Sequence, residues 1–66
     1  MAYHWKKVMS GTEVVSMLKD NDWVKVRQAG SHVIMQKNGI SCPVPLHKEL
    51  KKGTLASIRR IVAQAD

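Results

Sequence analysis

The chain has a single cysteine, Cys42, among its 66 residues. One cysteine excludes an internal disulfide and any zinc site built from several cysteines, and we expect Cys42 to be a small buried apolar residue. Phenylalanine is absent, so the core must be built mainly from Val, Ile, Leu and Met. A thin two-layer packing of helices on a small sheet suits this supply better than a thick core.

Acidic residues are also scarce, because five Asp and Glu stand against eleven Lys and Arg, giving a net charge of +6. Such an excess favours an anionic partner, namely nucleic acid, an acidic protein or an anionic lipid surface, and charge alone does not choose among them. No apolar run approaches the roughly 18 residues of a membrane span. The opening MAYHWKK lacks the apolar stretch of a signal peptide. We therefore expect no membrane partner and a cytoplasmic location.

Two helices and three strands are predicted in one small domain, residues 10–66. Residues 10–21 predict a helix, because Ser10 and Glu13 can form a capping box. The runs WVKVRQ, HVIMQK and ISCPVP are typical of strands, and the prolines of the third place it at an edge. Residues 52–65 predict the closing helix. The order predicts an α+β fold of α-β-β-β-α type, a three-stranded antiparallel sheet with both helices on one face. Residues 1–9 are an extension, either an added strand or a loose arm.

The expected register of the hairpins decides which side chains share a face. Asn38-Gly39 is a strong two-residue hairpin signal. It pairs Met35 with Cys42 and Val33 with Val44, which predicts one apolar face under the helices. For the first hairpin, the hydrophobic pattern favours an even-length turn around Gly30, with Val24 and Val26 on that same apolar face. The open face would then carry Trp23, Lys25, Arg27, His32 and Ile34.

On the open face, His32 is the candidate working group. An imidazole exchanges protons near neutral pH, and RNA carries its own nucleophile, the 2′-hydroxyl. Lys25 and Arg27 are placed to hold a phosphate. An exposed histidine beside a turn is more often a residue of no special role, so this pattern alone does not assign catalysis.

Other candidates have two interpretations each. Trp23 would either stack a base or cover the edge of the sheet. Lys52, with the neighbouring cations of the last helix, would either line a path for a nucleic-acid backbone or form a solvated face. The spacing of His4, His32 and His47 matches no zinc pattern, and no Gly-rich phosphate loop is present, so we expect no metal and no cofactor.

Three runs of the sequence together resemble the HicA toxins of bacterial toxin–antitoxin pairs. These runs are SGTEVVSMLKDNDW, VKVRQAGSHVIM and CPVPLHKELKKGTLASIRRI. The Gly-Ser-His motif ending at His32, together with the P-x-H-x-x-L-x-x-G-T-L-x-x-I segment beginning at Pro45, makes the resemblance specific. It covers roughly residues 9–62.

The resemblance implies a fold like a double-stranded-RNA-binding domain and the activity of an mRNA interferase, a ribonuclease that cuts transcripts. It implies that His32 is catalytic. We further expect Ser31 beside it to bind RNA and His47 to be at most auxiliary. It also implies a HicB antitoxin that binds the toxin and blocks its site. The alternatives are a non-catalytic RNA-binding module of the same fold and an adaptor that docks a protein.

The sequence departs from the family pattern at three places. The extension MAYHWKKV precedes the usual start, and the ending VAQAD differs from the usual short ending. Asp22 stands where a glycine often precedes the aromatic residue, so we expect a local difference at the end of the first helix.

Overall fold

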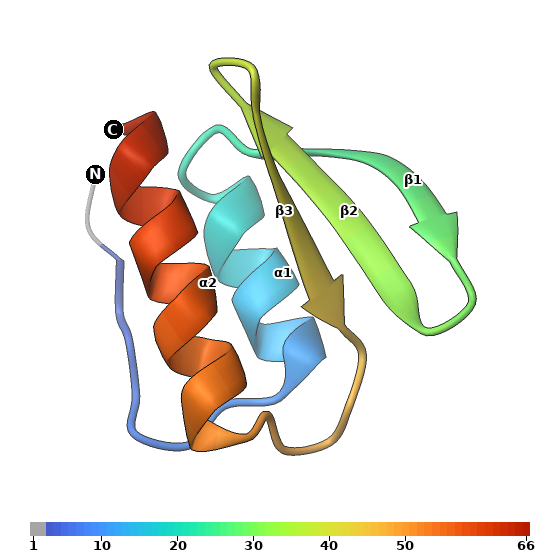
Figure 1. Cartoon of the computed structure of the whole chain (residues 1–66), viewed down its shortest axis with the longest axis vertical. Helices are drawn as coiled ribbons and strands as arrows, with labels where there is room; N and C mark the ends of the chain where they lie inside the picture. The colour runs from blue at the N-terminus through green and yellow to red at the C-terminus, as the bar shows by residue number, and fades with distance from the viewer. Residues whose placement is uncertain (1–2) are drawn as a thin grey trace.

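The order of helices and strands predicted from the sequence is confirmed by a computed structural model, which describes residues 3–66. The elements are α1 (Gly11–Lys19), β1 (Val24–Ala29), β2 (His32–Lys37), β3 (Ile40–Pro45) and α2 (Lys52–Ala65). The three strands form one antiparallel sheet in the order β1-β2-β3, and both helices lie on the same side of it (Figure 1). The predicted small α+β architecture is therefore correct.

Helix α1 begins with the predicted capping box. The Ser10 hydroxyl accepts from the Glu13 backbone N–H at 3.0 Å, and the Glu13 carboxylate accepts from the Ser10 N–H at 3.0 Å. These two bonds satisfy backbone donors that the first helical turn leaves without partners.

The end of α1 turns the chain inward through a left-handed residue. Asp22 has φ of +71°, and two backbone bonds close the turn, from Trp23 N–H to Leu18 O at 3.0 Å and from Asp22 N–H to Lys19 O at 3.3 Å. This is the Schellman pattern, in which apolar residues on the two sides of the turn contact one another. Leu18 and Trp23 are accordingly both buried.

The core lies between the helices and one face of β2 and β3. The second hairpin has the predicted register, with Met35 opposite Cys42 and Val33 opposite Val44, and all four side chains are buried. Both turn residues, Asn38 and Gly39, have positive φ, as a tight two-residue hairpin turn requires. The helices add Val14, Met17, Leu18, Leu55, Ile58, Val62 and Ala65 to this core.

Strand β1 departs from the predicted alternation. The first turn has the predicted even length, since Ala29 pairs with His32 across Gly30 and Ser31. A β-bulge then lies between Lys25 and Arg27, so the two residues pair with Met35 and Ile34 and face opposite sides of the sheet.

Strand β1 also lies outside the core. All six residues of β1 are exposed, including Val24 at 59% and Val26 at 48%. The prediction that these two valines join the apolar face is therefore wrong. The physical reasons are that the bulge leaves Val24 opposite Gln36, on the face away from the helices, and that the helices mainly cover β2 and β3 (Figure 1).

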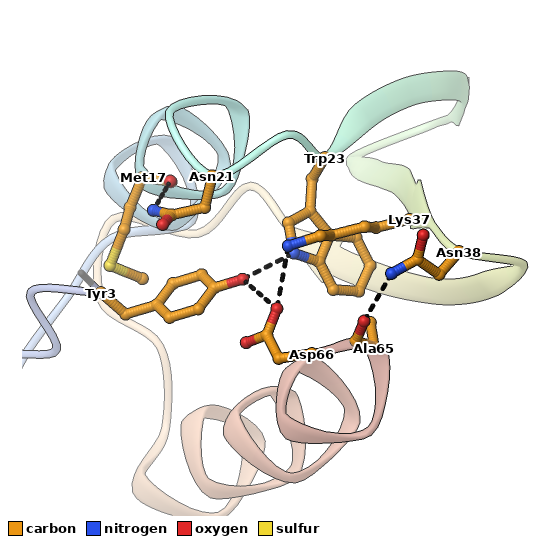
Figure 2. Close-up of polar contacts among 8 residues, drawn as sticks. All are labelled: Tyr3, Met17, Asn21, Trp23, Lys37, Asn38, Ala65 and Asp66. Atoms are coloured by element: carbon orange, nitrogen blue, oxygen red, sulfur yellow. Dashed lines mark hydrogen bonds and ion pairs between the residues drawn. The ribbon is translucent and has the colours of Figure 1, made fainter. Parts of the chain in front are cut away.

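Residues 3–10, which we call the N-terminal arm, are ordered without forming a strand. The Tyr3 hydroxyl accepts from the Trp23 indole N–H at 3.0 Å and donates to the Asp66 carboxylate at 3.2 Å. Lys37 donates to the same carboxylate at 2.9 Å (Figure 2). The arm thus joins the end of α1, the second hairpin and the end of α2.

Within residues 3–66, none of the helices is long and apolar enough to cross a membrane.

Candidate functional site

His32 is the first residue of β2 and is exposed at the end of the sheet. It follows a two-residue turn in which Gly30 has φ of +58°. Its cross-strand neighbours are Ala29 on β1 and Pro45 on β3, and neither side chain can form hydrogen bonds. In the part of the chain that the structure describes, the imidazole has no hydrogen-bond partner, so both ring nitrogens are open to a ligand.

Arg27 lies on the same face of the sheet as His32. It pairs with Ile34, one diagonal step along the β1–β2 ladder from the histidine. Diagonal neighbours on one face have Cα atoms about 7–8 Å apart, within reach of a long side chain. Arg27 therefore lies on the predicted face, within reach of the imidazole.

Lys25 was predicted to share this face, and the structure corrects that placement. The bulge sets Lys25 opposite Met35, which points toward the helices. Its ammonium donates to the Gln28 side chain at 3.0 Å, and Gln28 pairs with buried Val33 on that same side. Lys25 is exposed, but it lies on the side of the sheet opposite to His32.

Trp23 was also predicted on the open face, and this prediction is wrong. The side chain is only 2% exposed and belongs to the core. The turn after α1 carries it inward, and its indole N–H is bound by Tyr3. A base cannot stack on it in the folded protein, so Trp23 is no longer an RNA-binding candidate. The sequence did hold one sign of this inward turn. Asp22 stands where glycine is common in the family that the sequence resembles, and it directly precedes an apolar residue.

Ser31 and His47 lie at the same end of the molecule as His32. The Leu46 backbone N–H donates to the Ser31 carbonyl at 2.6 Å, which ties the segment after β3 to the first turn. His47 follows and is exposed, and its carbonyl accepts from the Gly11 N–H at 2.9 Å. The predicted auxiliary role of His47 thus remains open to test.

Gly11 is structurally important, and the sequence analysis did not single it out. A Cβ at this position would lie 2.8 Å from the Leu46 Cα and still closer to the Pro45 carbonyl oxygen. Glycine therefore allows the start of α1 to approach the segment that carries His47. The only signal in the sequence was a glycine directly after the capping serine.

Lys52 begins α2 and is exposed, but the structure does not group it with His32 and Arg27. It lines a cavity beside the N-terminal arm instead. No acidic side chain lies in the first turn of α2, and Lys51 provides no side-chain cap, so this end of the helix keeps its positive character.

Within residues 3–66, the cysteine and the other metal-ligating side chains form no second catalytic site. Cys42 is fully buried, and burial raises the pKa of its thiol to about 11, which keeps it protonated at neutral pH. Within residues 3–66, no group of three or more His, Cys, Asp or Glu side chains is arranged to hold a metal ion.

Comparison with known proteins identifies the family. A profile of the family described as HicA toxin of bacterial toxin–antitoxin matches residues 11–66. No curated protein and no solved structure gave a significant match. The matched segment holds every helix and strand described above, together with His32 and Arg27. The chain therefore belongs to the HicA family, the toxins of bacterial toxin–antitoxin systems.

Proposed function

We propose that this toxin is an endoribonuclease that cleaves mRNA in the cytoplasm without a metal ion, and that a HicB-type antitoxin blocks it. The observation that carries the proposal is the exposed His32 imidazole, which has no partner in residues 3–66 and shares a sheet face with Arg27. The histidine belongs to the Gly-Ser-His motif of a chain in a toxin family.

The chemistry needs few groups because RNA supplies the nucleophile. Neutral His32 accepts the proton of a 2′-hydroxyl as that oxygen attacks the neighbouring phosphorus. The P–O5′ bond then breaks, and the leaving 5′-oxygen takes a proton from an imidazolium or from water. Arg27 presents a planar fork of N–H donors to the phosphate oxygens and stabilises the charge that develops there.

Ser31 and His47 have supporting roles in this proposal. The Ser31 hydroxyl lies beside His32 in the turn and can donate to a phosphate oxygen. His47, at the same end, is the candidate second proton-transfer group. General acid–base catalysis by one side chain contributes typically about 10²–10⁴-fold, so the enzyme is expected to be slow.

The antitoxin is expected to cover the open face. Arg27 gives this face a positive charge, and the whole chain carries +6, so an acidic partner surface is complementary. A protein bound there excludes RNA from His32 simply by occupying the same area.

The first experiment compares the wild type with His32→Ala during induced expression in a bacterium, following growth and full-length mRNA together. We expect arrest and mRNA loss in the wild type and neither in the variant. His4→Ala is the matched control, since His4 is an exposed histidine of the arm and should stay active. Full RNA cleavage by folded His32→Ala would show that the assignment is wrong.

A non-catalytic RNA-binding module is the second candidate. It is favoured because, of the two cations predicted on the face of His32, the structure keeps only Arg27 there, which gives the imidazole little electrostatic support for catalysis. Purified protein is incubated with RNA in EDTA. Cleavage supports the ribonuclease, whereas salt-dependent binding of intact RNA supports the module.

A further inference from the structure

A cationic cavity of about 390 Å³ lies between the N-terminal arm and α2, on the helical side of the molecule. Five of its lining residues are basic and none is acidic: Lys6, Lys7, Lys52, Arg59 and Arg60. Leu55 and Ala56 form an apolar part of its surface. We call this the arm–helix groove. None of the residues predicted from the sequence to act at the open face lines it.

Most of the positive charge in the groove is not neutralised by the protein. Lys6 pairs with Glu13, and it is the only one of the five cations with a carboxylate partner among residues 3–66. Arg59 lies over the Trp5 ring, 5.5 Å from its centre, and Arg60 donates to the Ser57 hydroxyl at 3.4 Å. Both of these contacts leave the charge of the guanidinium intact.

The groove is fixed in shape by the anchored arm. Tyr3 is held by Trp23 and Asp66, and its ring stacks on Trp5 at 5.9 Å between ring centres. Trp5 in turn contacts Arg59 of α2. These contacts keep Lys6 and Lys7 beside the helix.

On α2, the cations follow one face. Lys52, Arg59 and Arg60 stand at i, i+7 and i+8, a spacing that aligns side chains along one side of a helix. With a rise of 1.5 Å per residue, they extend over roughly 11 Å. Such a row matches a polymer with a charge on every unit better than it matches a single ion.

We propose that the arm–helix groove binds the phosphodiester backbone of an RNA strand. The proposal rests on the proposed function, in which RNA is the substrate, and adds a second contact area on the helical side. The cavity has the size of ligand pockets, about 300–1,000 Å³, so it can accept more than one phosphate group. Its charged side chains are all donors, which suits the acceptor oxygens of phosphate rather than the N–H groups of a peptide.

Two of the groove cations, Lys6 and Lys7, precede the segment that matches the family, residues 11–66. The arm thus supplies part of the groove from outside the matched domain. We expect the groove to increase RNA affinity and to leave the proton transfer at His32 unchanged.

The test measures RNA binding in a His32→Ala background, where cleavage cannot interfere. A short labelled single-stranded RNA is titrated with protein at several salt concentrations. The slope of log K against log salt is negative, and each lost phosphate contact on a single strand reduces its magnitude by about 0.7. Lys7→Ala combined with Arg60→Ala should therefore bind more weakly and reduce the magnitude of the slope by about 1.4.

A control variant separates the groove from general charge. Lys19→Glu makes the same change of net charge at an exposed position in the last turn of α1, outside the groove. We expect it to change the slope little. An unchanged slope in the folded double variant, or an equal fall in the control, would overturn the proposal.

Two further readouts keep this proposal separate from the ribonuclease. In protein that retains His32, the double variant should raise KM for RNA and leave kcat unchanged. If the wild type cuts no RNA but the slope still falls in the double variant, the groove proposal stands and the ribonuclease fails. If the double variant keeps full RNA affinity and instead loses binding of poly-glutamate, the groove is a site for acidic protein and the proposal is wrong.

Discussion

Asp22 turns the chain inward after α1, and Trp23, which follows it, is buried in the core. The Asp22 φ of +71° is left-handed, a conformation that costs residues with a Cβ roughly 1–2 kcal/mol, less for Asp than for most. Asp22→Gly removes this cost but adds backbone entropy to the unfolded chain. We expect a net gain of about 0.5 kcal/mol in the free energy of unfolding, measured by urea denaturation.

Asp20→Gly is the matched control for that experiment. Asp20 has an ordinary helical φ of −67°, so glycine brings no relief there and should lower stability. Equal effects of the two substitutions would contradict the account of the turn after α1.

At the residue scale, the sheet face on which each side chain lies was predictable wherever a tight turn fixed the register of the two strands. The Asn38-Gly39 turn fixes the register of β2 and β3, and so His32 was correctly placed opposite to Val33 and Met35. Trp23 was misplaced because the alternation of β1 was extended back through it. It belongs instead to the turn that closes α1, and a turn of this kind has no period of two.

At the scale of elements, the close approach of α1 to the segment after β3 depends on Gly11. Gly11→Ala places a methyl group 2.8 Å from the Leu46 Cα, against backbone that cannot move alone. Overpacking of this kind costs typically about 1–3 kcal/mol, and we expect a loss of stability in that range in a thermal or urea unfolding experiment.

The loss should be specific to that glycine. Gly53, in the first turn of α2, has open space around the position of a Cβ, and Gly53→Ala should be neutral or stabilising. If Gly11→Ala unfolds at the same denaturant concentration as the wild type, the segment that carries His47 is freer than the structure indicates.

The β-bulge shows why the site was only partly predictable at this scale. The sequence of β1 alternates, and nothing in VKVRQA signals an extra residue between Lys25 and Arg27. A bulge is decided by how an edge strand fits its neighbour, which is a tertiary property. Arg27 lies between the bulge and the hairpin turn, so it keeps the predicted sheet face. Lys25 lies on the other side of the bulge, so it faces the opposite side of the sheet.

At the scale of the molecule, the contact of Lys37 and Asp66 links the second hairpin to the end of α2. The hydrogen bond from Lys37 lowers the pKa of the Asp66 carboxyl from its ordinary 3.8 and raises the pKa of Lys37 from 10.5. A lowered carboxyl pKa adds stability above pH 3.8 that is lost as the pH falls through the folded-state value. The raised lysine pKa adds stability below pH 10.5 that is lost at higher pH.

Asp66→Asn should therefore be less stable than the wild type at neutral pH, and the difference should vanish in strong acid. The measurement is urea unfolding of both proteins over a pH series. Asp20→Asn is the control, because Asp20 forms no ion pair in the described chain. A difference that persists unchanged at low pH would show that Asp66 acts through its shape and not its charge.

The hydrogen bond between Tyr3 and Asp66 joins residues 63 positions apart. Bringing such distant segments together costs more entropy than closing a hairpin, and it is cheapest after the rest of the chain is in place. The arm is therefore expected to dock late, after the rate-limiting step of folding. Contacts made that late leave the folding rate unchanged and slow only unfolding. Extending the domain with an arm thus prolongs the lifetime of the folded toxin.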